Sequence, residues 1–164
     1  MRSPRAAWFY GSAIVALALD QVTKAAARSA LSPGRPRTLV PGFLSLDLSF
    51  NTGGAFGLLP DWAPLFIIAA LAAVFAIVRL SRKGFAASSL ATGLGLLMGG
   101  ALGNLADRLL SPAREVTDFI SVQLAFGART YAWPTFNIAD SAIVIGAILV
   151  LLNVYVIDKA RGGD

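Results

Sequence analysis

The sequence predicts an all-α membrane protein with four transmembrane helices and a small extracytoplasmic β-sheet on the membrane surface. Of its 164 residues, 56% are hydrophobic and only 14% are charged, against about 25% charged residues in soluble domains. Four apolar stretches approach the length of about 20 residues that crosses a bilayer. A fifth stretch alternates apolar and polar side chains, which is typical of a half-buried strand. No internal repeat divides the chain, so we interpret residues 1–164 as one membrane-embedded domain.

The four predicted spans cover residues 8–27, 63–80, 85–106 and 138–157. The third is the most uniform, because it contains no charged residue. The first carries Asp20 and Lys24 in its last turns and follows basic residues, so it resembles a signal peptide. We interpret it as a retained span, because Asp20 interrupts the apolar run where cleavage would be expected.

Basic residues indicate the orientation. The 14 Lys and Arg residues divide equally between the two sides of the predicted spans. On the side of the termini they lie in short tails and in the tight turn at residues 80–84, whereas on the other side they are spread over residues 28–62 and 107–137. The positive-inside rule gives most weight to short loops. Both termini are therefore expected in the cytoplasm, with the two long connections outside.

The β region is expected at residues 38–60. Pro41 and Gly42 break helical structure there, and residues 43–50 (FLSLDLSF) then alternate with a period of two. Glycines follow in Asn51-Thr-Gly-Gly-Ala-Phe-Gly57, where the simple interpretation is a tight turn. A functional interpretation adds Asn51 and Gly54 as contacts for a substrate backbone.

Composition removes several kinds of chemistry. The chain has no cysteine and no histidine, so thiol nucleophiles, Ser-His catalysis and imidazole-bound or thiolate-bound zinc are excluded. We expect neither metal nor cofactor. The net charge of +5 is spread along the chain, which favours membrane lipid over nucleic acid as its partner.

Asp118 and Asp140 are the candidate catalytic residues. Each lies beside an apolar segment, where a carboxylate is costly and therefore indicates function. Asp118 alone could be an ordinary solvated acid, and Asn137 with Asp140 resembles a capping box at the start of a helix. Together, however, two neighbouring carboxylates can share one proton and activate water, so the pair favours the catalytic interpretation.

Two further groups of polar residues are predicted to support that pair. Asn104, Asp107 and Arg108 share one helix face, either as an ion pair that caps the helix or as groups that hold a substrate or a carboxylate. Asp20 and Lys24 stand four residues apart, the spacing of a structural ion pair at a helix end.

Five segments together resemble the lipoprotein signal peptidase (signal peptidase II) family, the membrane aspartic peptidases of bacteria. They are Asp20-Gln-Val-Thr-Lys24, Asn51-Thr-Gly-Gly-Ala-Phe-Gly57, Gly99-Gly-Ala-Leu-Gly-Asn-Leu-Ala-Asp-Arg108, Thr117-Asp-Phe-Ile120 and Phe136-Asn-Ile-Ala-Asp-Ser-Ala-Ile143.

The resemblance implies an endopeptidase that cuts diacylglyceryl-modified prolipoproteins just before the lipidated cysteine. It implies a catalytic dyad of Asp118 and Asp140, with Asp107 as the alternative to Asp118 because residues 109–117 are longer than the family usually has. Supporting or substrate-binding roles follow for Asp20, Lys24, Asn51, Gly54, Asn104, Asp107, Arg108 and Asn137. We expect a monomer in the bacterial inner membrane, with its active site on the extracytoplasmic side.

A transporter or assembly factor is the alternative function. A small four-helix protein could pass protons along Asp20, Asp107 and Asp140. Such a relay requires acids at the middle of the membrane, whereas Asp107, Asp118 and Asp140 all fall at span ends on one side. The sequence therefore favours chemistry at the membrane surface.

Overall fold

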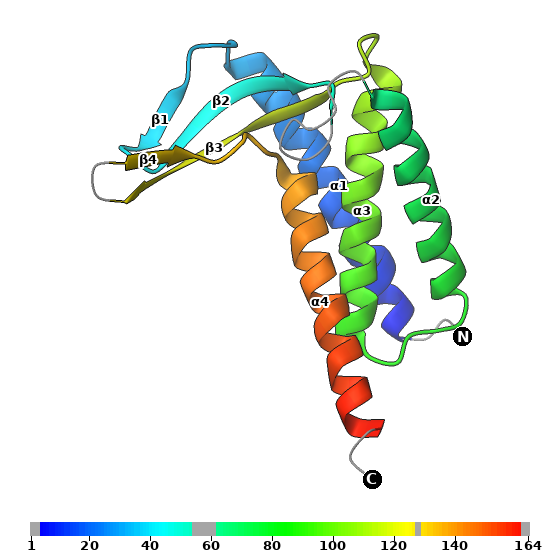
Figure 1. The fold of residues 1–164 in the computed structure, drawn as a ribbon. Helices are drawn as coiled ribbons and strands as arrows, with labels where there is room; N and C mark the ends of the chain where they lie inside the picture. The colour runs from blue at the N-terminus through cyan, green and yellow to red at the C-terminus, as the bar shows by residue number, and fades with distance from the viewer. Residues whose placement is uncertain (1–3, 54–61, 127–128, 162–164) are drawn as a thin grey trace.

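The part of the chain that the structure describes forms four helices and a four-stranded sheet (Figure 1). The computed structural model describes residues 4–53, 62–126 and 129–161. The elements in chain order are α1 (Pro4–Ala30), β1 (Arg37–Val40), β2 (Leu44–Asn51), α2 (Ala63–Ser81), α3 (Ser88–Leu110), β3 (Val116–Phe126), β4 (Arg129–Ala132) and α4 (Ile138–Arg161). The sheet projects from one end of the helical bundle, and the start of α1 and the end of α4 lie at the other end (Figure 1).

Helix α3 is the centre of the bundle, because it packs against each of the other three helices. Its small residues make this possible. A Cβ on Gly99 would lie 2.5 Å from the Ala13 carbonyl oxygen of α1, and one on Gly100 would lie 2.5 Å from the Ala139 carbonyl oxygen of α4. Consecutive glycines thus bring α1 and α4 against two adjacent faces of α3, as small residues do between membrane helices.

The sheet is antiparallel with strand order β1-β2-β3-β4. Its base packs on the end of α1, where Ala27, Leu48 and Phe119 form a buried cluster. In the β2–β3 register, Ser49 is opposite Asp118. Ile120 also forms a bridge to Phe136, just before α4. These pairings place the ends of β2, β3 and α4 at a common point.

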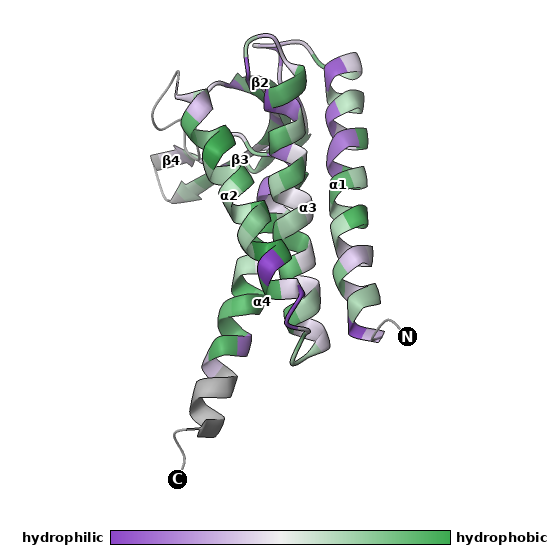
Figure 2. Ribbon diagram, turned by 90° about the vertical axis from the view of Figure 1, so that its right-hand side faces the viewer, coloured by the Kyte–Doolittle hydropathy of each residue, from purple (hydrophilic) through white to green (hydrophobic). Residues whose placement is uncertain are grey.

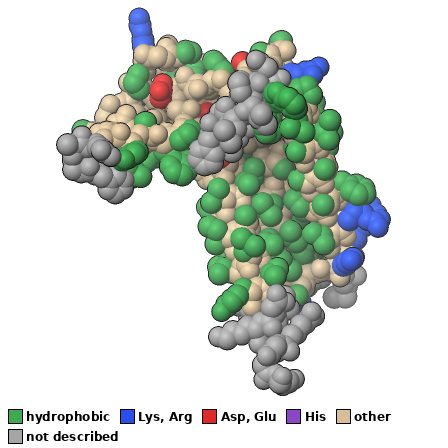
Figure 3. Space-filling view, viewed as in Figure 1, with side chains coloured by type: hydrophobic (Ala, Val, Ile, Leu, Met, Phe, Trp, Pro, Cys, Tyr) green, Lys and Arg blue, Asp and Glu red, His purple; other side chains and the backbone are tan. Residues whose placement is uncertain are grey.

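Within the described residues, three helices are long and apolar enough to cross a membrane: α2, α3 and residues 138–155 of α4. Hydrophobic side chains cover the helices between two ends that carry Lys and Arg (Figure 3). The first predicted span, residues 8–27, lies within α1, but α1 is not among the candidate spans of the described residues. Hydrophilic residues occupy its half nearest the sheet (Figure 2), because Asp20 and Lys24 belong to that half.

The predicted elements are largely present, with shifted ends. The expected strand at 43–50 corresponds to β2. The other long strand of the sheet, β3, lies after residue 110 and therefore outside the β region expected at residues 38–60. The alternation of Val116, Asp118, Ile120, Val122 and Leu124 was the available signal for β3. Asp118 interrupts the apolar residues of this alternation, so the pattern did not predict a strand.

Candidate active site

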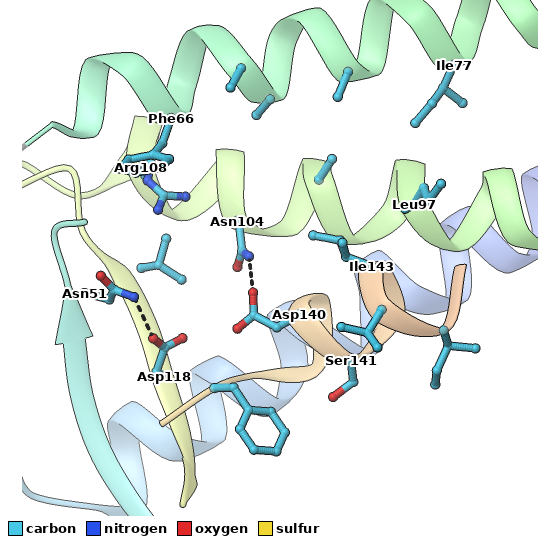
Figure 4. Close-up of a pocket in the computed structure, with 18 of the residues that line it drawn as sticks. Asn51, Phe66, Ile77, Leu97, Asn104, Arg108, Asp118, Asp140, Ser141 and Ile143 are labelled. Carbon is cyan, nitrogen blue, oxygen red and sulfur yellow. Dashed lines mark hydrogen bonds between the residues drawn. The ribbon is translucent and has the colours of Figure 1, made fainter. Parts of the chain in front are cut away.

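A cavity of about 1010 Å³ lies between α2, α3 and α4 and reaches the base of the sheet. Along the helices its lining is apolar, with small side chains on α2 and larger ones on α4. At the sheet end the lining includes a group of polar side chains (Figure 4): Asn51, Asn104, Arg108, Asp118 and Asp140. The cavity therefore joins a long hydrophobic surface to two carboxylates.

Asp118 and Asp140 come from different elements and face this polar end (Figure 4). Asp118 lies on β3 and is only 2% exposed. Asp140 lies in the first turn of α4, where the helix dipole favours a negative charge. The expected capping box is also present, because the Asn137 Oδ1 accepts from the Asp140 N–H (3.0 Å) and the Asp140 Oδ2 accepts from the Asn137 N–H (3.1 Å). The capping interaction leaves the other Asp140 oxygen directed to the site.

Two asparagine amides connect the carboxylates. The Asn137 Nδ2 donates to the Asp118 Oδ1 (2.6 Å) and to the Asn104 Oδ1 (3.1 Å). The Asn104 Nδ2 in turn donates to the Asp140 Oδ1 (2.8 Å). Asn51 completes the set, because its Nδ2 donates to the Asp118 Oδ2 (3.2 Å) while its Oδ1 accepts from the Gly53 N–H (2.9 Å). Both oxygens of each carboxylate are therefore hydrogen-bonded.

The pKa of Asp118 is raised from 3.8 to about 6. Burial is the largest cause, followed by the charge of Asp140, because both disfavour the ionised carboxylate. Hydrogen bonds from Asn51 and Asn137 and the charge of Lys24 act in the opposite direction. A carboxyl with this pKa retains a proton at a pH where an ordinary aspartate has lost it.

A buried ion network lies behind the pair. Lys24 and Asp20 are both fully buried and 2.8 Å apart (Nζ to Oδ2), and the Lys24 Nζ is 3.1 Å from the Asp107 Oδ2. Asp20 also accepts from the N–H of Ala139 (2.9 Å), and Asp107 accepts from the N–H of Thr117 (2.9 Å). The two acids thus hold the backbone next to Asp140 and Asp118, one residue away in each case.

Arg108 is a positively charged residue that lines the cavity. It is 8% exposed, and its Nη2 donates to the Gly53 carbonyl oxygen (2.7 Å). Its guanidinium lies 5.4 Å from the centre of the Phe66 ring, a cation–π distance. Its buried Nε has no acceptor among the described residues. Arg108 can therefore donate one more hydrogen bond to a group that enters the cavity.

The structure brings nearly all the predicted site residues together. Asn51, Asn104, Arg108, Asp118 and Asp140 line the cavity, while Asp20, Lys24, Asp107 and Asn137 lie behind them. Gly54 lies outside the described residues. Among the described residues, no group of three or more His, Cys, Asp or Glu side chains could hold a metal ion.

Sequence reasoning missed three polar members of the network. Gln21 donates to Asp20 (3.1 Å) and to Asp107 (3.3 Å), and Arg28 donates to the hydroxyl of Thr117 (2.9 Å). The spacing of Asp20, Lys24 and Arg28 at four-residue intervals was a signal for Arg28. Nothing local to the sequence indicated Thr117.

Comparison with known proteins assigns the family. Residues 12–156 match the family model described as Signal peptidase (SPase) II. The chain belongs to the signal peptidase II family. A lipoprotein signal peptidase of Oleidesulfovibrio alaskensis is 42% identical over 93% of this chain and 97% of its own length, and one of Pseudomonas putida is 37% identical over 98% and 93%.

A solved structure of a bacterial membrane enzyme has a similar fold. It is titled "Bacterial membrane enzyme structure by the in meso method at 2.3 A resolution" and superposes with a TM-score of 0.78 at 32% identity, over 92% of this chain and 88% of that one. The protein is thus a membrane aspartic peptidase that removes signal peptides from prolipoproteins, as expected for a signal peptidase II. The alternative of a proton-relay transporter is not favoured.

Proposed function

We propose that Asp118 and Asp140 are the catalytic dyad of this signal peptidase and hydrolyse the peptide bond through an activated water. The observation that carries the proposal is that both carboxylates face one cavity and share a chain of amide hydrogen bonds. Two carboxylates this closely coupled hold one proton between them, so one can act as base and the other as acid. Asp107 fits this role less well, because Lys24 and the Thr117 N–H engage its carboxylate.

The substrate is a prolipoprotein whose cysteine carries diacylglycerol, cut just before that cysteine. Its apolar parts fit the helical part of the cavity, whose lining includes Ala69, Ala73, Leu97, Ile143 and Val144. Each buried CH₂ of an acyl chain contributes about 0.8 kcal/mol, so the lipid supplies much of the binding energy. The polar end then receives the peptide, with Asn51 and Arg108 as donors to its carbonyl groups. Gly54, which follows Asn51 by three residues in the sequence, also contacts the substrate backbone.

The enzyme acts as a monomer in the bacterial inner membrane, with α1 as its fourth span. The buried face of α1 carries Asp20 and Lys24, while Ile14, Val15 and Val22 are more than half exposed. Polar groups that face the bundle and apolar groups that face outward are the arrangement of a membrane helix. Both termini then lie in the cytoplasm, and the sheet with the active site lies on the extracytoplasmic surface.

The dyad is tested with Asp118→Asn and Asp140→Asn. Each substitution keeps the side-chain shape but removes a group that gains and loses a proton, so cleavage of a diacylglyceryl lipobox peptide should fall at least about 1000-fold. The comparison is Asp107→Asn, measured with the same substrate in the same membrane mimic. An active Asp118→Asn enzyme together with an inactive Asp107→Asn enzyme would move the dyad to Asp107 and Asp140.

A further inference from the structure

Lys24 has one contact that its charge does not explain. Its ammonium group is fully buried and meets two carboxylates, those of Asp20 and Asp107. Its third partner is neutral, because the Nζ donates to the Asn104 Oδ1 at 2.8 Å. An ammonium can only donate hydrogen bonds, so this contact sets which end of the Asn104 amide faces Lys24.

The orientation of Asn104 is therefore determined by donors. Lys24 on one element and the Nδ2 of Asn137 on another both point at its oxygen. Asn137 cannot turn around either, because its own oxygen accepts from the backbone N–H of Asp140. With its oxygen engaged in this way, Asn104 presents its NH₂ group to the Asp140 Oδ1.

Asp140 consequently accepts a hydrogen bond at each oxygen. One comes from the Asn104 amide (2.8 Å) and one from the Asn137 backbone (3.1 Å). Hydrogen bonds donated to a carboxylate favour its ionised form. Asp118 also accepts two, at 2.6 and 3.2 Å, so the hydrogen bonds alone do not distinguish the two carboxylates. Asp140, however, lies in the first turn of α4, where the helix dipole favours a negative charge. Asp118 is only 2% exposed, and its burial raises its pKa to about 6. The shared proton therefore belongs on Asp118.

We propose that Lys24 is a positioning residue that acts through Asn104 to keep Asp140 as the ionised member of the dyad. This rests on the proposed function. Asp140 then takes a proton from water as the water oxygen bonds to the scissile carbonyl carbon, and Asp118 gives its proton to the carbonyl oxygen. As the C–N bond breaks, Asp140 passes its proton to the leaving nitrogen, and Asp118 recovers a proton from a hydroxyl of the tetrahedral intermediate.

The experiment must separate this role from simple charge loss. The charged groups around Asp140 come from three elements: Asp20 and Lys24 on α1, Asp107 and Arg108 on α3, and Asp118 on β3. The double variant Asp20→Asn/Lys24→Met removes an ion pair as a unit, so the net charge of this set does not change. The measurement is kcat/KM against pH, whose acid limb reports protonation of the base.

The double variant should move the acid limb upward by about one pH unit. Without Lys24, only the Asn137 amide holds the Asn104 oxygen, so the Asn104 NH₂ group is less firmly directed to the Asp140 Oδ1. Weakening this hydrogen bond favours the protonated form of Asp140. Arg28→Met is the matched control, because Arg28 reaches Asp107 and Thr117 but makes no hydrogen bond to Asn104. Its acid limb should stay in place. An unmoved limb in the double variant would overturn the proposal.

A second background tests the route through Asn104. In Asn104→Ala enzyme, removing the Asp20–Lys24 pair should shift the limb no further, and a persisting shift would show a direct electrostatic effect instead. If the double variant fails to fold, Asn104→Asp provides the test with Lys24 in place: its added carboxylate should raise the acid limb, and an unmoved limb would refute the link.

Infrared titration of the protonated carboxyl band replaces kinetics for slow variants. Activity in Asp118→Asn or Asp140→Asn would overturn the proposed function. An unmoved acid limb in the double variant, with both of these single variants inactive, would overturn only the role of Lys24.

Discussion

At the scale of single residues, asparagine amides define this site as much as its acids do. Asn51, Asn104 and Asn137 each have the amide oxygen engaged by a donor and the NH₂ group on a carboxylate. A neutral amide binds an ionised acid without bringing a second charge, so the carboxylates remain able to exchange protons. The cation Lys24 contacts the two carboxylates of the proposed dyad only indirectly, through its hydrogen bond to Asn104.

The raised pKa of Asp118 predicts a stability effect that depends on pH. Its folded-state pKa, about 6, lies above 3.8, so the stability that its protonated carboxyl provides is complete below about pH 3.8 and is lost as the pH rises through 6. Asp118→Asn cannot ionise. The melting temperature of the variant minus that of the wild type should therefore increase from pH 4 to pH 8, by an amount that corresponds to about 2 kcal/mol.

The measurement is thermal unfolding in one detergent across that pH range. Ser121→Ala, on the same strand, is the control for effects that do not involve ionisation, and its difference from wild type should not change with pH. A constant difference for Asp118→Asn would show that folding does not raise the pKa of Asp118.

At the scale of elements, the close contact of α3 with α4 positions Asp140 of the proposed dyad. Gly100 lies against Ala139, the residue before Asp140, and a Cβ there would be 2.5 Å from the Ala139 carbonyl oxygen and 2.7 Å from the Ile143 Cγ1. Backbone atoms cannot move aside as a flexible side chain can. The first turn of α4, and with it Asp140, depends on this glycine.

Gly100→Ala should consequently displace the start of α4. We expect a loss of about 1–3 kcal/mol in stability and a larger fractional loss in kcat than in substrate binding. Gly11→Ala on α1 is the matched control, because nothing lies within 4 Å of a Cβ at that position and alanine favours a helix. Wild-type activity and melting temperature in Gly100→Ala would contradict the positioning role of this contact.

At the scale of the whole molecule, the fold joins an apolar cavity to the polar end that holds the proposed dyad. Ala73 and Ala72 are neighbours on α2, but only Ala73 lines the cavity. Ala73→Phe should fill part of it and raise KM for a diacylglyceryl peptide about 10-fold, whereas Ala72→Phe should leave KM unchanged. Steady-state kinetics with both variants checks this, and equal KM values would place the lipid elsewhere.

The orientation of the molecule can be measured because the chain has no cysteine. Single cysteines at Thr38, on β1, and at Lys83, after α2, lie at opposite ends of the bundle. In intact cells freed of their outer membrane, a membrane-impermeant maleimide should label Thr38→Cys and should label Lys83→Cys only after lysis. The reverse pattern would invert the proposed topology.

The sequence by itself determined the class of protein, three spans, one strand and the residues worth testing. Hydropathy and period-two alternation are local properties of the sequence. The structure of a stretch such as residues 63–81 can therefore be predicted without knowing what packs against it. The five segments that resemble signal peptidase II identified the family in the same way, because each is short and contiguous.

Only the tertiary structure decided what these residues do to one another. The strand β3 became recognisable through its pairing with β2, because Asp118 interrupts its apolar face. The role of Lys24 as more than the partner of Asp20 depends on Asn104, 80 residues away. Such contacts arise where glycines let α1, α3 and α4 approach closely, and that approach is a property of packed helices rather than of any one segment.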